Sequence, residues 1–355
     1  MARDVRVSLK HDMFRAVFTV LSATGAHRLS GPRFRGKGAI LMLHHVRPWH
    51  ERAFAPNRLL EVTPEFLDAV LGRCRAIGLD LVAMDDVADR MADADAPPFV
   101  AVTFDDGYRD TLDEALPVLR RHGAPATVYV TPGFADRSSP LWWLDLEHAV
   151  ERLGRITIDL GTGPETLAAG SPAEKAAAFE RIYWALRAGP EERLRATIAD
   201  LAARAGVDSL GSVAALCLDW EGIRRLAADP LVTIGAHTMT HPMLAKHPAD
   251  VAWHEMALSR SVVAERTGRP VRHFAYPVGD PGSAGPREFR AATEMGFTTA
   301  VTTRPGMLFA EHATIPTALP RVSLNGHFQS LDQFEVLMSG LPFWLWNRGR
   351  RVNAA

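Results

Sequence analysis

Residues 99–104, Phe-Val-Ala-Val-Thr-Phe, are apolar on both faces of an extended chain. The run is too short for a helix and lies between Pro97-Pro98 and Gly107, so it predicts a strand buried on both sides. Asp105 and Asp106 follow it directly. Successive strand residues point to opposite faces, so the chain must turn here, and Gly107 makes that turn accessible. Functional residues gather at such strand ends in α/β sheets, although Asp-Asp-Gly alone is equally typical of a simple turn.

A repeated order of strands and helices surrounds this segment. Helical patterns lie between the strands, as at 64–78, where Thr63 is the expected N-cap and Pro64 the first helical residue. This spacing predicts a parallel sheet. Several strands end in polar residues, so we expect an α/β fold in which a βα barrel carries a site on its rim. The other predicted strands cover 38–46, 79–84, 126–130, 232–237, 271–276, 298–302 and 319–324.

Residues from about 140 to 220 interrupt this order. Trp142 and Trp143 open a predicted helix, 156–160 begins a predicted hairpin, and two helices are predicted at 172–187 and 190–205. No Pro- or Ser-rich linker frames the segment, so we interpret it as a mainly helical insertion rather than a separate domain. The predicted division is a basic N-terminal helical segment (1–38), a barrel with this insertion (39–325), and a C-terminal helix with a basic aromatic tail (326–355).

The composition limits the classes of partner. The 355 residues are 47% hydrophobic and 23% charged, as in ordinary soluble proteins, and a net charge of −1 gives no general attraction to nucleic acid. Cys74 and Cys217 lie far apart in apolar surroundings, typical of reduced thiols in a cytoplasmic core. No run of 18 apolar residues predicts a membrane span, and the N-terminus lacks the features of a signal peptide. We therefore expect a cytoplasmic protein. The oligomeric state is not predicted.

Polar side chains at two predicted strand ends form a candidate metal site. His237 ends one strand, and His241 follows it four residues later. A catalytic zinc keeps three nitrogen or carboxylate ligands, which the two histidines and either Asp105 or Asp106 would supply. Pro242 disfavours a helix at His241, so we expect the pair to bridge a strand end and a tight loop. The glutamate of the His-Glu-x-x-His metalloproteases is absent.

Three motifs together resemble the polysaccharide deacetylases of carbohydrate esterase family 4, the group with NodB homology. They are Thr103-Phe-Asp-Asp-Gly107, His237-Thr-Met-Thr-His241-Pro242 and Tyr276-Pro-Val-Gly279. The resemblance covers about residues 39–325 and implies a distorted (β/α)7 barrel. It also implies a hydrolase that removes N-acetyl groups from an acetamido sugar or polysaccharide.

The same resemblance assigns roles to the residues of the first two motifs. It implies that Asp105 is the general base and that Asp106, His237 and His241 bind a divalent metal. That metal is commonly zinc, and Co²⁺ and Ni²⁺ are alternatives.

Two positions depart from the family pattern. The third motif usually has an arginine where this chain has Ala275, so the partner of the base must come from elsewhere, with Arg272 and Arg321 as candidates. The late Leu-x-His motif is also absent, since His327 stands in another context. Permuted deacetylases that act on poly-N-acetylglucosamine place the acid histidine after an N-terminal strand instead. Leu43-His44-His45-Val46 resembles that segment, which makes His44 the candidate acid and leaves the role of His45 open.

The predicted chemistry is metal-assisted amide hydrolysis. Asp105 removes a proton from the attacking water, protonated His44 donates one to the leaving amine, and the backbone N–H of Tyr108 stabilises the oxyanion. Trp142, Trp143 and Tyr276 are candidates for stacking on sugar faces, although tryptophans that open a helix are more often core residues. Arg321 is a further candidate for substrate binding.

Other functions use the same residues. The apparatus also suits an O-acetyl esterase, or a deformylase acting on a lipid-linked sugar. Two histidines and a carboxylate bind iron in non-haem oxygenases, but that function leaves Asp105 and His44 without a role. A catalytically impaired sugar-binding homologue is favoured by the missing motif arginine.

Both ends of the chain are basic. Residues 1–38 carry eight Lys or Arg and two Asp, and the C-terminus contains Phe343-Trp-Leu-Trp-Asn-Arg-Gly-Arg-Arg351. Aromatic residues beside arginines favour peripheral contact with an anionic membrane, here the inner face, and a lipid-linked acetamido sugar would then be the expected substrate. The alternative is that both ends pack on the barrel with solvated arginines.

Overall fold

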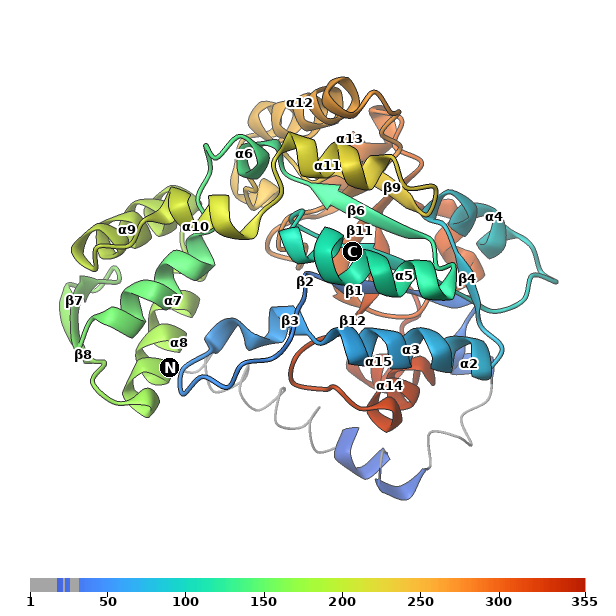
Figure 1. Ribbon diagram of the computed structural model, residues 1–355, viewed down its shortest axis with the longest axis horizontal. Helices are drawn as coiled ribbons and strands as arrows, with labels where there is room; N and C mark the ends of the chain where they lie inside the picture. Colours follow the sequence, from blue (N-terminus) through green and yellow to red (C-terminus); the bar gives the residue numbers. More distant parts are fainter. Residues whose placement is uncertain (1–17, 22, 26–31, 355) are drawn as a thin grey trace.

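The computed structural model describes residues 18–21, 23–25 and 32–354, and its central feature is a closed parallel barrel (Figure 1). In this part of the chain the barrel has seven strands in chain order, and the last strand, β12, pairs with the first, β1, through Leu41 and Val322. The predicted (β/α)7 barrel is thus confirmed. The strands are β1 (Gly38–Leu43), β5 (Phe99–Phe104), β6 (Ala126–Val130), β9 (Val232–Ala236), β10 (His273–Ala275), β11 (Thr299–Pro305) and β12 (Leu319–Ser323).

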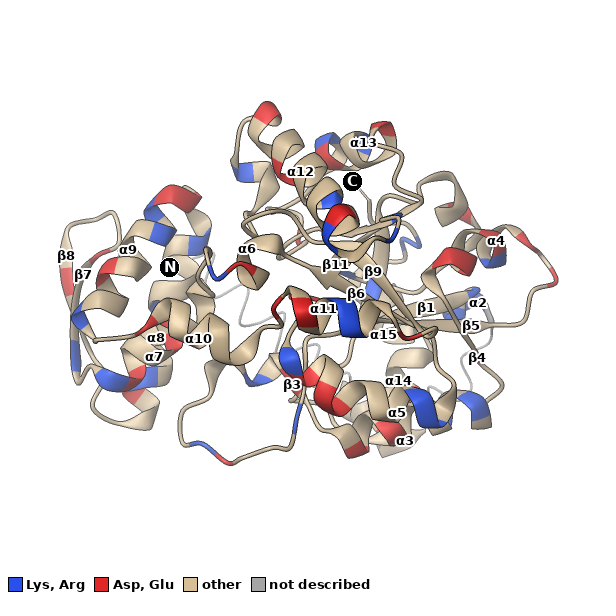
Figure 2. Ribbon diagram, turned by 45° about the horizontal axis from the view of Figure 1, so that its top comes forward, with Lys and Arg blue, Asp and Glu red and all other residues tan. Residues whose placement is uncertain are grey.

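The barrel strands are apolar on both faces because one face lines the barrel and the other lies under helices. Every residue of β1, β5 and β6 is buried. Positive and negative residues are interspersed over the outer helices (Figure 2). These helices are α3 (Pro64–Ala76), α5 (Leu116–His122), α11 (Trp220–Ala227), α12 (Ala249–Thr267) and α13 (Pro286–Glu294). As predicted, Thr63 caps α3, its side chain accepting a hydrogen bond from the Phe66 amide.

The predicted strand at 79–84 is present as the short β4 (Asp80–Val82), but it does not close the barrel. β4 pairs with Phe99–Ala101, the first half of β5, whereas β6 pairs with the second half. β1 pairs with the other edge of β5 along the whole length of both strands. β4 therefore fills the space at the amino end of β5 that β6 leaves open.

The insertion forms the lobe at the left of Figure 1. The predicted hairpin is confirmed as an antiparallel pair, and the predicted helices are present. The lobe has its own hydrophobic cluster, which Tyr108 and Met243 join from loops at the carboxyl ends of barrel strands. Its elements are α7 (Trp142–Arg152), β7 (Arg155–Asp159), β8 (Pro164–Ala168), α8 (Pro172–Ala188), α9 (Glu191–Arg204) and α10 (Ser209–Leu216).

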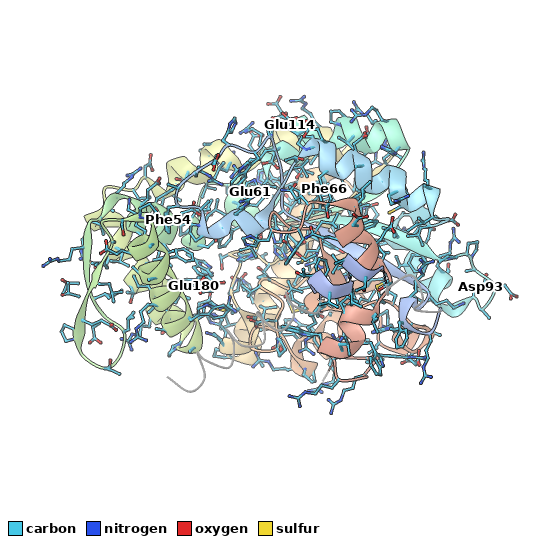
Figure 3. All side chains as sticks on the ribbon, turned by 90° about the horizontal axis from the view of Figure 1, so that it is seen from below. Phe54, Glu61, Phe66, Asp93, Glu114 and Glu180 are labelled. Carbon is cyan, nitrogen blue, oxygen red and sulfur yellow. The ribbon has the colours of Figure 1, made fainter. Side chains whose placement is uncertain are left out.

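A loop from the barrel also packs against the insertion. The loop follows β2 (His45–Val46) and leads through a 3-10 turn, η2 (Pro56–Leu60), to β3 (Glu61–Val62). Phe54, labelled in Figure 3, lies 6.2 Å from the Phe179 ring of α8, measured between ring centroids. Glu61 accepts hydrogen bonds from Arg47 and Arg52 of the same loop. The contact between Phe54 and Phe179 therefore packs this barrel loop against the insertion.

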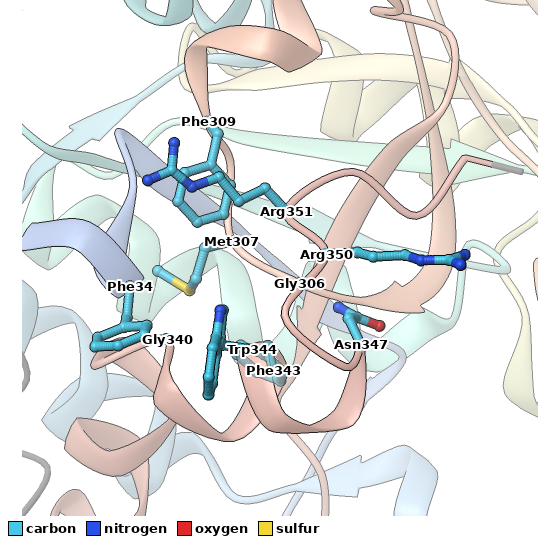
Figure 4. Close-up of a pocket in the computed structure, with 10 residues that line it drawn as sticks. All are labelled: Phe34, Gly306, Met307, Phe309, Gly340, Phe343, Trp344, Asn347, Arg350 and Arg351. Carbon is cyan, nitrogen blue, oxygen red and sulfur yellow. The ribbon is translucent and has the colours of Figure 1, made fainter.

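The C-terminal segment contains two short helices, α14 (Leu331–Met338) and α15 (Leu341–Trp346), where one was predicted. Gly340 separates them with a left-handed φ of 74°. α15 packs near α2 (Pro32–Arg35), where the Phe34 and Trp344 rings are 5.3 Å apart. α2, α15 and the segments that follow β11 and α15 line a pocket (Figure 4). Most of the predicted N-terminal helix lies outside the described residues, and no described helix is long and apolar enough to cross a membrane.

Candidate active site

The chain leaves β5 through a tight turn that separates the two aspartates. Asp106 and Gly107 both have left-handed backbones, with φ of 69° and 67°. This conformation costs a residue other than glycine about 1–2 kcal/mol, so surrounding contacts must hold Asp106 in it. As a result the Asp105 carboxylate meets Arg321, whereas the Asp106 carboxylate faces His237 and His241.

Asp106, His237 and His241 form a buried group suited to a divalent cation. One donor atom from each lies within 4.8 Å of the others. The Nε2 atoms of His237 and His241 are 3.5 and 3.4 Å from Asp106 Oδ1. Within the described residues that buried oxygen has no hydrogen-bond partner, which is costly for a carboxylate. Two imidazole nitrogens and one carboxylate oxygen are a common catalytic zinc set, so the residues fit the metal.

The hydrogen bond of His237 and the burial of His241 both suit metal binding. His237 Nδ1 lies 2.7 Å from the Ala275 carbonyl oxygen, which assigns the proton of the neutral ring to Nδ1 and leaves Nε2 free to ligate. Burial lowers the pKa of His241 to about 3, so this ring is neutral. Burial works against the charged form of His237 too, but the hydrogen bond to Asp106 and the charges of Asp105 and Asp106 together outweigh burial and raise the pKa of His237. Burial likewise opposes charge on Asp106, yet the two histidines hold its pKa below the usual range.

Asp105 is held by an arginine from the far end of the barrel sequence. Arg321 donates two hydrogen bonds to it, Nη1 to Oδ1 at 2.8 Å and Nη2 to Oδ2 at 2.6 Å. Burial would raise the pKa of the Asp105 carboxyl, but the Arg321 guanidinium holds it below the usual range. Of the two arginines considered as a substitute for the motif arginine, Arg272 instead pairs with Asp85 and is half exposed. The chain thus supplies the missing guanidinium from β12.

His44 faces the same carboxylate from the end of β1. Its Nε2 lies 3.9 Å from Asp105 Oδ2, and its side chain is 17% exposed. Burial lowers the pKa of His44, although Asp105 and Asp106 oppose that shift. His44 is therefore next to the candidate base and partly open to solvent.

Three residues predicted to bind substrate have no surface with which to do so. Tyr276 is fully buried, packs against Phe289, and donates from Oη to the Thr317 carbonyl at 2.8 Å. Trp142 is buried between other aromatic rings of the insertion. Arg321 is buried and directs its guanidinium to Asp105. Helices of the barrel and the insertion cover the Tyr276 and Trp142 rings, so neither ring offers an open face to a sugar.

Tyr108 and Trp143 lie in the site but are also buried. The Tyr108 ring stacks on His45 with 3.6 Å between centroids, and the Trp143 ring is 5.0 Å from that of His241. The backbone of Tyr108 follows the Asp106–Gly107 turn directly. Its N–H remains a candidate oxyanion donor, while neither ring offers an open face for a sugar.

Sequence reasoning left the role of His45 open and did not consider Asp110. His45 Nδ1 lies 2.6 Å from Asp110 Oδ2, and the Val46 amide donates to Asp110 Oδ1 at 3.1 Å. Asp110 thus ties the end of β1, which carries His44, to the loop that carries Tyr108. Only the position of Asp110 shortly after the Asp-Asp-Gly motif pointed to such a contact.

Comparison with known proteins identifies the family and the fold. Residues 92–300 match the family model described as polysaccharide deacetylase. The deacetylase PplD of Streptococcus pyogenes, solved in complex with acetate, superposes with a TM-score of 0.55 at 17% identity, over 84% of this chain and 97% of that one. IcaB from Ammonifex degensii gives a TM-score of 0.52 at 17% identity, over 86% and 97% of the two chains.

A de-N-acetylase from Aggregatibacter actinomycetemcomitans has a TM-score of 0.52 at 13% identity, over 84% of this chain and 99% of that one. At these identities the structural likeness concerns the fold. No curated protein sequence matches the chain. The family match spans more than half of the chain and includes the Asp-Asp-Gly turn, both histidines and the strands between them. The protein therefore belongs to the polysaccharide deacetylase family.

Proposed function

We propose that this protein is a metal-dependent hydrolase that removes N-acetyl groups from an acetamido sugar or polysaccharide. Membership of the deacetylase family supports the removal of acetyl groups. One observation carries the proposed metal dependence. Two adjacent aspartates are separated, so that Asp106 joins His237 and His241 in a buried ligand set while Asp105 is held apart by Arg321.

Asp106, His237 and His241 are the residues that would hold the cation, with zinc as the first choice for this donor set. When bound, such a cation supplies Lewis acidity toward the acyl carbonyl and lowers the pKa of a coordinated water.

The remaining steps belong to residues of the chain. Asp105, kept ionised by Arg321, accepts the proton of the attacking water. Protonated His44 donates a proton to the leaving amine, and the Tyr108 N–H stabilises the oxyanion. The C–N bond of the acetamide breaks, and acetate and the free amino sugar result.

The contacts of Asp105 argue against two of the alternative functions, a sugar-binding homologue and an iron oxygenase. The impaired sugar-binding homologue was favoured by the absent motif arginine, but Arg321 supplies a two-pronged ion pair to Asp105. An iron oxygenase leaves that ion pair and His44 without a role. An O-acetyl esterase or a deformylase uses the same residues, so the substrate must be tested directly.

The test is hydrolysis by metal-free protein and by protein reloaded with Zn²⁺, Co²⁺ or Ni²⁺. The substrates are N-acetylglucosamine oligomers, their N-formyl analogues and an O-acetylated sugar, and NMR detects acetate, formate and free amine. We expect acetate and free amine from the N-acetyl oligomers with metal only. Release from the ester or formamide alone would replace the proposed substrate, and equal release without metal would refute metal dependence.

Variants separate the ligands from the base. We expect Asp106→Ala, His237→Ala and His241→Ala each to lose bound metal, measured by elemental analysis after dialysis. Asp105→Asn should keep the metal and lose activity, because its side chain faces Arg321 rather than the histidines. Equal loss of metal in all four variants would contradict this division of roles.

A further inference from the structure

The loop that carries the two histidines has an unfavourable backbone. Thr238 and His241 both adopt left-handed conformations, with φ of 62° and 60°. β-branched residues such as threonine rarely do so, and the conformation persists only where surrounding contacts impose it. Some of these contacts lie inside the loop, since the His241 amide donates to Thr238 Oγ1 at 3.1 Å. The others come from two helices outside it.

Charged side chains hold this loop from both sides. On the barrel side, Glu255 of α12 accepts hydrogen bonds from the Met239 and Thr240 amides at 2.8 and 2.9 Å. On the insertion side, Arg195 of α9 donates to the Thr240 and His241 carbonyl oxygens at 3.2 and 2.8 Å.

Glu191, buried at the start of α9, completes the contact on the insertion side. It accepts from Arg195 Nε at 2.8 Å and from the Met243 amide at 2.6 Å. Its second oxygen also lies 3.0 Å from His247 Nε2. Glu191 and Arg195 therefore bind the chain on both sides of Pro242.

The two histidines are anchored differently. His237 directs Nδ1 to the Ala275 carbonyl oxygen, so an acceptor on the barrel fixes its ring. His241 Nδ1 is buried without a hydrogen-bond partner in the described residues. The His241 ring instead packs between Trp143 and Phe134, at centroid distances of 5.0 and 5.6 Å. Of the contacts that position His241, those to its backbone carbonyl and to one ring face, from Arg195 and Trp143, come from the insertion.

We propose that Arg195 and Glu191 of the insertion are positioning residues for the metal centre. They hold His241 where its Nε2 can join His237 and Asp106, so the insertion sets the affinity of the site for its cation. This inference rests on the metal site of the proposed function. It extends that function by assigning the insertion a part in building the site.

The experiment measures Zn²⁺ affinity in Arg195→Ala by competition with a chromophoric chelator. The matched control is Arg204→Ala, because Arg204 lies on the same helix but donates to Thr157 of the hairpin. Outer partners of metal ligands contribute about 10–100-fold to affinity, so we expect Arg195→Ala to raise the Kd for Zn²⁺ at least about tenfold. Arg204→Ala should leave that Kd within about twofold of the wild type.

Two further measurements distinguish positioning from general stability. Far-UV circular dichroism of the metal-free proteins should show that Arg195→Ala and Arg204→Ala are both folded at the temperature of the binding measurement, although loss of the cation beside the buried Glu191 lowers the unfolding midpoint of Arg195→Ala further. The d–d absorption of bound Co²⁺ should change only in Arg195→Ala, as its coordination is altered. Arg195→Lys, which keeps the charge but offers fewer fixed donors, should restore part of the affinity.

If Arg195→Ala fails to fold, Arg195→Lys and Glu191→Gln are measured in its place, and each should still weaken Zn²⁺ binding more than Arg204→Ala. Wild-type affinity and Co²⁺ absorption in the Arg195 variants would overturn this inference and leave the proposed function intact. Absence of metal binding by the wild-type protein would refute the proposed function itself.

Discussion

At the scale of single residues, the site depends on one arginine that binds only the first of two adjacent carboxylates. Arg321 is buried, and its Nε donates to the Thr302 carbonyl at 2.9 Å while both terminal nitrogens bind Asp105. The guanidinium is thus fixed by backbone and carboxylate together. Asp105 consequently stays ionised in a buried place, as a general base near neutral pH must.

We expect Arg321→Ala to reduce both stability and activity, because it leaves the buried Asp105 without its cation. Loss of one partner of a buried ion pair costs about 3–5 kcal/mol, so the free energy of unfolding in urea should fall by that order. Arg272→Ala, which breaks the partly exposed pair with Asp85, should cost less than about 1 kcal/mol. Similar losses in the two variants would contradict the assignment.

The same pair should appear in the pH dependence of stability. The folded pKa of Asp105 is held below its unfolded value of about 3.9, so its contribution is complete above that pH and is lost on acidification. Arg321→Ala should therefore lose less stability than the wild type as the pH falls below about 4.

Another residue-scale prediction concerns His44, the proposed general acid. We expect His44→Ala to lower turnover about 10²–10⁴-fold, the usual contribution of a general acid, and to remove the alkaline limb of the pH profile. The sign follows from the role, since activity falls as pH rises through the pKa of a group that must be protonated. His327→Ala, an exposed histidine, is the control. Wild-type turnover in His44→Ala together with a loss in His327→Ala would reverse the assignment.

Most of the candidate site could be predicted because its residues follow predicted strands. Asp105, Asp106, His237 and His44 each stand at a strand end, and the carboxyl ends of parallel strands meet on one rim. The partner of Asp105 could not be chosen in this way, since Arg321 is 216 residues away in the chain and lies within a strand. The burial of the Tyr276 and Trp142 rings could not be predicted either, because it depends on helices that only the folded chain brings over these rings.

At the scale of elements, runs that are apolar on both faces located the barrel strands well. This pattern did not distinguish β4 from the seven barrel strands, because the composition of β4 resembles theirs. Its position depends on the fact that β4 and β6 pair with different halves of the same edge of β5. Contacts between the insertion and the His241 loop were also beyond prediction. They join side chains of α9 to backbone groups, which no sequence pattern marks.

The fit between neighbouring strands gives an element-scale prediction. Gly235 of β9 lies opposite Tyr129 of β6, and a Cβ there would be 2.4 Å from the Tyr129 ring and 2.9 Å from the His273 carbonyl oxygen. Gly235→Ala should therefore lower the free energy of unfolding by about 1–3 kcal/mol. Gly154→Ala, where no atom lies within 4 Å of the added Cβ, is the control and should be close to neutral. Equal unfolding midpoints for the two variants would contradict this packing.

At the scale of the whole molecule, the C-terminal helix and the candidate site lie at different ends of β1. α15 packs against α2, which directly precedes β1, whereas His44 follows the carboxyl end of that strand. Trp344, Leu345 and Trp346 are 39%, 46% and 38% exposed, and the exposed Arg348 and Arg350 follow them in the chain. Figure 4 shows Trp344 and Arg350. A membrane bound there would leave the catalytic rim facing away from it. We therefore expect any membrane contact to favour a glycan that extends from the surface.

The last prediction tests this contact. We propose that the exposed rings of α15 settle among headgroups while Arg348 and Arg350 meet lipid phosphate, since aromatic residues beside cations suit an anionic interface. The protein should sediment with liposomes containing phosphatidylglycerol at low salt, but not at high salt or with neutral liposomes. Trp344→Ser combined with Arg348→Gln and Arg350→Gln should abolish sedimentation, whereas Trp253→Ser, which removes an equally exposed tryptophan of α12, should not. Recovery of the wild-type protein in the supernatant under all conditions would refute the membrane contact.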